Sequence, residues 1–439
     1  MSAVIHRARH AVHVVRQTFP FRLPALLVAV FFFTGANSLL TTVIGLRAAE
    51  EGMSPIAIGL LGAAYFAGFV SASLFGAEPV KRVGHIRAFA AFGAIMIQAV
   101  LIYPVAVHEA VWLVLRFASG WGASILYMII ESWLNAESTN ENRGQVLSRY
   151  RMVDLASVIV GQLLLSVVPV SGVLIFTVVG LSFLWAIMPV ALTRQSGPAP
   201  ITSAKADLKG LFSASPMAAA GGIAIGITGG IFWSVAPFLL REQGYDSQTI
   251  GLFISATILG GAITQWPFGR LSDRIDRRWV IVLTALITGT AAIGLALAET
   301  LGLSFPVLIA LGMVYGGGYL PIYSLCVAHA NDQVRGGNFV PTAAALLTCY
   351  GFGAVAGPLI AGAAGLVAHE APFLVGATAM FGLALFGLYR MTAKASPRKE
   401  DKERFVEPPR TTTQALELDP RAHERHRDAN RDAEPPPGH

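Results

Sequence analysis

The sequence predicts an all-α membrane protein with twelve transmembrane helices, arranged as two six-helix parallel pseudo-repeats. The chain has 439 residues, of which 54% are hydrophobic and 13% are charged, and its mean hydropathy is +0.59. Such a composition is typical of membrane proteins and argues against a water-soluble catalytic domain. Two further observations support the prediction: the chain contains twelve long apolar runs, and its two halves resemble each other at a fixed offset.

Each apolar run is long enough to cross a bilayer, since about 20 apolar residues in a helix cover a hydrocarbon core of roughly 30 Å. Only residues 169–172 separate the fifth and sixth runs, where one long helix is an alternative, but Pro169 and Gly172 favour a turn between two helices. The predicted spans are 23–46, 55–77, 87–106, 110–130, 151–169, 172–192, 217–240, 248–268, 279–298, 303–328, 339–362 and 371–389.

The distribution of Lys and Arg predicts which side of the membrane is cytoplasmic, because cytoplasmic loops carry the excess of these residues. Twenty basic residues near the spans fall on the side of both termini, whereas the opposite side has only Arg47 and Arg241. We therefore expect a multi-pass protein of the bacterial inner membrane with both termini in the cytoplasm. The basic start followed by an apolar run also suggests a cleaved signal peptide, but the run is about twice the usual length, so we interpret it as the first span.

The chain divides into five segments by composition. Residues 1–22 form a basic cytoplasmic N-terminus, residues 23–192 an N-terminal six-helix bundle, and residues 217–389 a C-terminal six-helix bundle. Residues 193–216, which contain Ser, Gly and Pro, form a cytoplasmic linker between the bundles. Residues 390–439 are dense in charges and contain three consecutive prolines, so we expect a disordered cytoplasmic tail.

The two bundles are predicted to be parallel copies. A gap-free shift of 192 residues superposes Gly52 on Gly244 and Gly68 on Gly260, and matches continue for about a hundred residues further. Small residues at matched positions let membrane helices pack closely. Because six is an even number of spans, both copies enter the membrane from the same side and are related by an axis along the membrane normal.

No pattern in the sequence indicates an enzyme, a cofactor or a metal centre. Cys326 and Cys349 are the only cysteines, so neither a disulfide framework nor a cysteine-based metal site is available. The sequence has no Walker loop for ATP and no nucleophile motif. The formal charge of +6 suggests nucleic acid, but the basic residues lie between apolar runs without interleaved aromatic residues. We therefore expect the lipid bilayer, and not nucleic acid, as the partner.

The segment from Gly269 to Arg278 reads Gly-Arg-Leu-Ser-Asp-Arg-Ile-Asp-Arg-Arg, which resembles the loop signature of the major facilitator superfamily. It departs from that signature at Asp276, where glycine is usual, and the counterpart in the first half has Lys81 in place of the acid. The resemblance implies that Asp273 clasps neighbouring helix ends and favours closure of one face. The alternative is a basic turn that follows only the excess of Lys and Arg on the cytoplasmic side. This alternative explains the arginines but not Asp273 among them.

The fourth span carries Arg116 before a face of small residues, which is similar to a second signature of the superfamily. A guanidinium keeps its proton, so within a membrane it should face a partner or a wet cavity; alternatively, Arg116 reaches toward the nearby membrane surface. The resemblance implies that spans one, four, seven and ten line a central cavity. Hydrogen bonds between helices are the alternative explanation for each polar residue. The predicted cavity residues are Asn37, Thr41, Arg116, Tyr127, Trp233, Tyr315 and Tyr319.

Nearly the whole chain resembles the YcaD-like branch of the superfamily, for example at Ile130-Glu131-Ser132-Trp133 and Gln265-Trp266-Pro267. We expect charged residues at the cytoplasmic helix ends to form a latch that breaks when that face opens. Asp154, about one turn inside the membrane, is the candidate for proton coupling, because burial favours a protonated carboxyl group. Alternatively, Glu131 titrates. The predicted latch comprises Glu131, Arg143, Arg149, Gly269, Asp273, Arg274, Arg277 and Arg278.

The sequence therefore predicts a secondary active transporter that moves a small organic solute by alternating access, is coupled to protons and acts as a monomer. The antiporter signature of the superfamily is absent from the fifth span, which reads Val160-Gly161-Gln162-Leu163, and this weakens the case for drug–proton exchange. Arg116 and the tyrosines suit an anionic or aromatic solute. Two alternatives stay open: an uncoupled facilitator, and a scaffold or sensor that has the transporter fold and acts through its tail.

Overall fold

The regular structure of the protein is helical throughout the part of the chain that the computed structural model describes, as the sequence predicts. The predicted basic N-terminus, most of the linker and most of the tail lie outside the described residues. The described residues are 22–139, 141–192, 198, 206–334, 339–393, 405 and 411–412.

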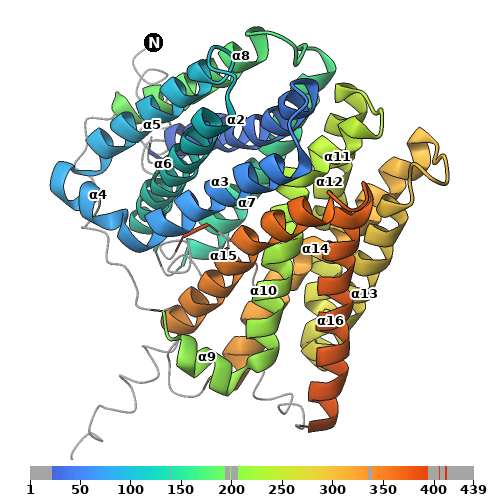
Figure 1. Cartoon of the computed structure of the whole chain (residues 1–439). Coiled ribbons are helices and arrows are strands. Elements are labelled where there is room, and N and C mark those ends of the chain that lie inside the picture. Colours follow the sequence, from blue (N-terminus) through green and yellow to red (C-terminus); the bar gives the residue numbers. More distant parts are fainter. Residues whose placement is uncertain are drawn as a thin grey trace, which may run out of the picture.

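The N-terminal half of the chain forms a bundle in which α2 packs against α7 and α8, and α3 packs against α6. Figure 1 shows these helices in colours from blue to green. Its helices are α2 (Arg22–Glu50), α3 (Pro55–Phe75), α4 (Ala77–Val83), α5 (His85–Ile102), α6 (Glu109–Ala136), α7 (Arg143–Leu163), a short 3-10 turn (Leu164–Ser166) and α8 (Leu174–Ala191).

The C-terminal half forms a second bundle, in which α10 packs against α15, α12 against α14, and α13 against α16. A π-helical turn interrupts one membrane span between α10 and α11. The helices are α9 (Leu208–Ala214), α10 (Pro216–Gly230), the π-turn (Ile231–Val235), α11 (Ala236–Glu242), α12 (Ser247–Arg274), α13 (Arg277–Ala296), α14 (Phe305–Gln333), α15 (Phe339–Ala364) and α16 (Ala371–Ala393).

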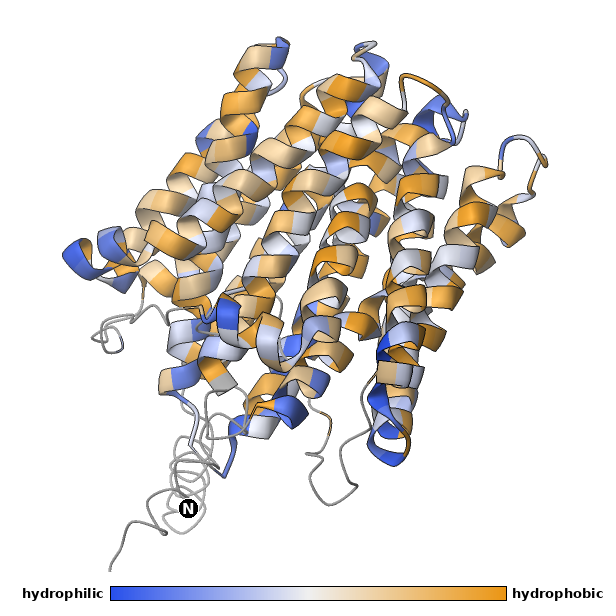
Figure 2. Cartoon of the chain, turned by 60° about the horizontal axis from the view of Figure 1, so that its bottom comes forward, coloured by the Kyte–Doolittle hydropathy of each residue, from blue (hydrophilic) through white to orange (hydrophobic). Residues whose placement is uncertain are grey.

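Eleven helices of the described chain are long and apolar enough to cross a membrane, with α10 and α11 counted as one. The predicted fifth span is not among them, because α7 carries Arg143, Arg149, Arg151 and Asp154. It nevertheless packs between α2 and α12. Hydrophobic residues cover the helices along most of their length, and hydrophilic residues gather toward the ends (Figure 2).

Several helices extend beyond the predicted spans. Helix α6 continues to Ala136, so Glu131 lies on the helix. Helix α12 continues to Arg274, so Gly269 and Asp273 lie on its last turns and not in a loop. An apolar run ends at the first charged residue, whereas backbone hydrogen bonding can continue through polar residues. The sequence pattern therefore underestimates the length of these helices. Helix α9 lies within the predicted linker.

Two turns that the 192-residue offset pairs have the same local structure. Gly52 and Gly244 both have a positive φ, of 68° and 87°, which glycine adopts without steric cost. Two residues later, the Ser54 side chain accepts a hydrogen bond from the backbone N–H of Ala57, and Asp246 accepts one from Thr249. Both side chains cap the start of the following helix.

The same offset pairs two glycines at close helix contacts. A methyl carbon added to Gly68 on α3 would lie 2.1 Å from the carbonyl oxygen of Phe117 on α6. One added to Gly260 on α12 would lie 2.1 Å from the carbonyl oxygen of Met313 on α14. Only glycine fits at such distances, and close backbone contact is how helices associate where lipid offers no hydrophobic gain.

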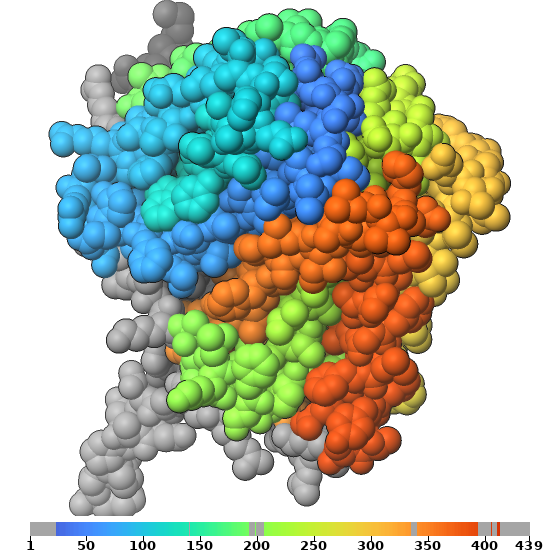
Figure 3. All heavy atoms as spheres, in the orientation of Figure 1, coloured from blue at the N-terminus to red at the C-terminus, as the bar shows by residue number. Residues whose placement is uncertain are grey.

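The main contacts between the two bundles join α3 with α15, α7 with α12, and α2 with α11. In the space-filling view, the orange surface of α15 lies directly against the blue surface of α3 (Figure 3). The interface between the bundles is therefore the place to look for a site that both halves share.

Candidate functional site

A cavity of about 400 Å³ lies between the two bundles. Helices α2, α3, α6 and α7 line it on one side, and Trp233 and α15 line it on the other. Leu74, at the end of α3, and Ala206, just before α9, are exposed residues of its lining. The cavity thus opens on the side of the molecule that carries α9. We call this side the linker side and the opposite side the far side.

The two bundles are in contact on the far side. A methyl carbon added to Gly59 on α3 would lie 2.4 Å from the carbonyl oxygen of Pro358 on α15. At the ends of α2 and α11, Arg241 Nη2 forms an ion pair with Glu50 Oε1 at 3.0 Å. The cavity is therefore sealed from the far side and accessible from the linker side.

A tyrosine and an asparagine form the polar centre of the cavity wall. Asn37 Nδ2 donates a hydrogen bond of 2.9 Å to Tyr65 Oη, and the Tyr65 hydroxyl is 3.2 Å from Asn37 Oδ1. Behind this pair, the guanidinium of Arg116 lies 4.4 Å from the centre of the Tyr65 ring. Arg116 Nε also donates to the carbonyl of Leu61 at 3.4 Å. Arg116 is 1% exposed, so it supports Tyr65 from inside the bundle and does not line the cavity.

Four of the seven predicted cavity residues line the cavity: Asn37, Thr41, Tyr127 and Trp233. The other three, Arg116, Tyr315 and Tyr319, are buried inside their own bundles. The rings of Tyr315 and Tyr319 stack at 5.9 Å, and both lie close to Phe232. A helical stripe identifies residues that share a face, but it does not say whether that face meets the cavity or a neighbouring helix.

Sequence analysis missed two tyrosines of the cavity lining, Tyr65 on α3 and Tyr350 on α15. Both lie on helices that the resemblance did not place around the cavity. A tyrosine in the middle of a predicted span was the available signal, because a buried phenol needs a hydrogen-bond partner.

Asp154 reaches the cavity from α7. Its Oδ2 accepts a hydrogen bond of 2.8 Å from Arg151 Nη1 one turn earlier on the same helix. Both side chains are 15% exposed. One turn later, the hydroxyl of Ser157 contacts that of Thr34 on α2. Asp154 is the only charged residue among the described lining residues, so the wall is otherwise neutral, with hydroxyl, amide and aromatic groups.

Glu131 is fully buried on α6. It accepts a hydrogen bond of 3.0 Å from the phenol of Tyr150 on α7. Its two carboxylate oxygens also accept hydrogen bonds from the hydroxyls of Thr411 and Thr412, in the tail. All the hydrogen-bond partners of Glu131 among the described residues are therefore hydroxyl groups. Arg143, a predicted latch partner, donates instead to Asn135 at 2.8 Å, and Arg149 is exposed.

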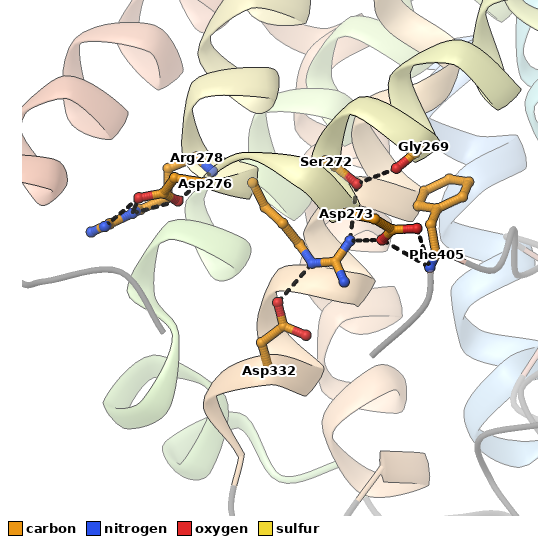
Figure 4. A network of polar contacts seen from close by, with 8 residues as sticks. Gly269, Ser272, Asp273, Asp276, Arg278, Asp332 and Phe405 are labelled. Carbon is orange, nitrogen blue, oxygen red and sulfur yellow. Dashed lines mark hydrogen bonds and ion pairs between the residues drawn. The ribbon is translucent and has the colours of Figure 1, made fainter. Parts of the chain in front are cut away.

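Two of the predicted latch residues of the C-terminal half, Asp273 and Arg277, form a charge cluster with Asp332 on the linker side (Figure 4). Arg277 Nε donates to Asp332 Oδ2 at 2.7 Å, and Arg277 Nη1 lies 2.9 Å from both Asp273 Oδ1 and Ser272 Oγ. The side chains of Arg277 and Asp332 are each 1% exposed. The sequence did not indicate Asp332, which α14 brings to the cluster. Arg274 is exposed.

Asp276, the departure from the loop signature, has a structural role at the start of α13. Its carboxylate accepts hydrogen bonds from the backbone N–H of Arg278 at 3.0 Å and from Arg278 Nη2 at 2.6 Å. Burial opposes ionisation of this carboxyl group, but the hydrogen bonds and charge of Arg278 outweigh that effect and lower the pKa of Asp276. Arg278 also donates to the backbone carbonyl of Arg390 at 3.0 Å, which ties α13 to the end of α16.

Comparisons with known proteins agree with this architecture. Residues 26–219 and 218–422 match the model of the Major Facilitator Superfamily. The MFS-type transporter YcaD of Salmonella arizonae is 29% identical over 348 residues, which cover 78% of this chain and 87% of that protein. YcaD of Salmonella typhimurium is 29% identical over 343 residues, covering 76% of this chain and 87% of its own.

Solved structures support the same fold. The nucleoside transporter NupG has a TM-score of 0.68 at 13% identity, and the alignment covers 85% of this chain and 99% of that chain. A bacterial homologue of the human lysosomal transporter Spinster, in an inward-facing and occupied conformation, has a TM-score of 0.66 at 17% identity. This alignment covers 88% of this chain and 99% of that chain. The family match extends over nearly the whole chain and over both bundles. This protein is therefore an integral membrane transporter of the Major Facilitator Superfamily.

Proposed function

We propose that the protein is a proton-coupled secondary transporter that moves a small organic solute across the bacterial inner membrane by alternating access. The observation that carries the proposal is the cavity between the bundles, which is sealed on the far side and open on the linker side. With α7 as the fifth span, the chain crosses the membrane twelve times in two parallel halves, and the linker side is cytoplasmic. The structure then corresponds to an inward-open state, and rocking of the two halves exposes the cavity to the other side.

The cavity wall favours an uncharged aromatic solute with hydrogen-bonding groups. Its volume of about 400 Å³ lies in the range of roughly 300–1,000 Å³ that is usual for small-molecule sites. Tyr65, Tyr127, Trp233 and Tyr350 offer ring faces, and the hydroxyl and amide groups offer donors and acceptors. Arg116 lies behind Tyr65, so no described basic side chain meets an anionic solute in the cavity. The solute class of one structural neighbour, nucleosides, is one class with these properties.

The Asn37–Tyr65 pair provides a test of solute binding. We expect Asn37→Ala and Tyr65→Phe each to weaken the binding of a solute that contacts the pair by about fivefold, since one hydrogen bond contributes about 1 kcal/mol. A thermal-shift screen of the purified protein against uncharged aromatic metabolites and drugs would identify the ligand, and titration of the variants would measure its Kd. Ser182→Ala is the matched control, because within the described part of the chain the Ser182 hydroxyl bonds only to the α8 backbone at Val178. Unchanged Kd values in both variants would exclude this pair from the site.

Two carboxyl groups near the cavity are the candidates for proton coupling. Asp154 lines the cavity beside Arg151, and Glu131 is buried behind it among the hydroxyls of Tyr150, Thr411 and Thr412. The burial of a carboxyl group and its charged and hydrogen-bonding contacts determine how readily it binds a proton. A change in access to either carboxyl group, or in its contacts, would therefore change its proton occupancy.

Substitution of these carboxyl groups tests the coupling. We expect Asp154→Asn, Glu131→Gln or both to abolish accumulation of solute driven by a pH gradient in liposomes, while exchange without a gradient continues. Glu78→Gln is the control, since the Glu78 side chain is 59% exposed on α4. If the parent protein transports equally well with and without the gradient, the protein is an uncoupled facilitator.

A further inference from the structure

Three described residues of the C-terminal tail lie at the linker-side mouth of the cavity, far in sequence from the residues they contact. The backbone N–H of Phe405 donates to both carboxylate oxygens of Asp273, at 3.0 Å and 3.2 Å (Figure 4). The Phe405 ring lies over Gly269, where an added methyl carbon would be 2.3 Å from the ring edge. Glycine at position 269 therefore makes the space that the ring occupies.

The two threonines are anchored more deeply. The side chains of Thr411 and Thr412 both donate to the carboxylate of Glu131. Thr412 is 0% exposed, and Thr411 forms part of the cavity lining. A threonine in a charged terminal segment is ordinarily solvated, so full burial of Thr412 against a carboxylate indicates a specific contact.

These contacts connect the two halves of the transporter. Gly269 and Asp273 belong to α12 in the C-terminal bundle, whereas Glu131 belongs to α6 in the N-terminal bundle. The cavity reaches the linker side between these two bundles. The described tail residues use as acceptors the two carboxylates that were predicted to serve in a latch. Because Phe405 covers Gly269 and Thr411 lines the cavity, these residues have to leave before the walls can meet at these points.

We propose that the linker-side mouth is a binding site for the chain's own C-terminal segment, anchored by Phe405, Thr411 and Thr412, and that the bound segment slows closure of the mouth. The contacts of the segment are independent of transport, but the inhibitory effect rests on the proposed alternating access. Release of the segment removes its hydrogen bonds to Glu131 and Asp273 and allows the two bundles to approach each other on this side.

Cysteine labelling of the full-length chain tests the docking. The two buried native cysteines, Cys326 and Cys349, are replaced by serine, and a single cysteine is introduced by Thr412→Cys or, as an exposed reference on the same side, by Ala136→Cys. We expect a maleimide to react at position 412 about tenfold or more slowly than at position 136. Phe405→Ala should accelerate the reaction at position 412 about tenfold, because it removes a contact several residues away that holds the segment in place.

Substitutions in the bundle supply the matched comparison. Gly269→Val should accelerate labelling at position 412 because it fills the space of the Phe405 ring, whereas Arg274→Ala, an exposed neighbour on the same helix, should not. Thermal melting of each variant establishes that the bundles remain folded. Labelling at position 412 as fast as at position 136, or labelling that Phe405→Ala leaves unchanged, overturns the docking.

Transport provides a separate readout for the inhibitory role. Phe405→Ala should raise the rate of solute uptake into liposomes several-fold. Slow labelling at position 412 combined with an uptake rate that Phe405→Ala does not raise overturns the inhibition but leaves the segment bound. Labelling requires no solute, so absence of transport in parent and variant alike contradicts the proposed function and not the docking.

Discussion

Replacing Gly59 by valine is expected to abolish transport and to trap the protein with its linker-side mouth closed. The far side is sealed by backbone contact between α3 and α15. A methyl carbon at Gly59 would lie 2.4 Å from the carbonyl oxygen of Pro358 and 3.0 Å from Cα of Gly362, which no side chain can satisfy. The two helices must then separate, and overpacking of this kind costs about 1–3 kcal/mol. The population of the state observed here should fall by about tenfold or more.

The change in population can be measured without knowing the solute. A cysteine introduced by Ser73→Cys in the cavity wall should react with a maleimide from the linker side about tenfold more slowly when Gly59 is valine. Gly382→Val on α16 is the control, because no atom lies within 4 Å of a methyl carbon added there. If Gly59→Val keeps the parent's labelling rate and transport, contact between α3 and α15 is not the far-side seal.

Replacing Arg277 by alanine is expected to destabilise the protein by about 3 kcal/mol or more, because it removes one charge of the buried ion pair between Arg277 and Asp332. The side chain of Asp332 is 1% exposed, and Arg277 Nε lies 2.7 Å from its carboxylate. The side chain of the second partner, Asp273, is 32% exposed. Losing its contact with the guanidinium therefore contributes less to the destabilisation than the same loss at Asp332. Thermal unfolding in detergent should give a clearly lower midpoint for Arg277→Ala.

Two variants make this result specific. Arg274→Ala, in the same turn but exposed, should change stability by no more than about 0.5 kcal/mol. Removing both charges with Arg277→Met and Asp332→Leu should recover much of the loss, since replacing a whole buried ion pair by apolar residues is less costly than removing one of its partners. Equal midpoints for Arg277→Ala and Arg274→Ala would contradict an energetic role for the cluster.

The sequence predicted the helical fold because a membrane permits few alternatives. A chain in lipid must satisfy its backbone hydrogen bonds internally, so long apolar runs become helices. The start of α3 at Pro55 and the start of α15 at Phe339 follow directly from these runs. Helix α7 shows the limit of the argument, since a helix that packs between two others can carry arginines that an apolar window rejects.

The site was harder to predict, because its geometry depends on contacts between helices distant in sequence. Asn37, on a polar stripe, and Trp233, midway along its span, both line the cavity, but periodicity did not reveal that Arg116 faces Tyr65 inside the bundle. Motif residues such as Asp273 were identifiable from a resemblance. Their partners Asp332 and Phe405 were not, since neither belongs to a local pattern.

The π-turn at Ile231–Val235 gives one membrane span two different orientations. A π-turn holds one residue more than an α-helical turn, so the residues after it are rotated by roughly 100° relative to those before it. Before the turn, Gly226 packs against the α15 backbone; after it, Pro237 packs against Gly45 of α2 in the other bundle. The span thus packs against its own bundle before the π-turn and against the opposite bundle after it. Deleting a single residue from this turn would bring the two ends back into phase and aim one of them at lipid, even though the hydrophobicity of the span would be almost unchanged.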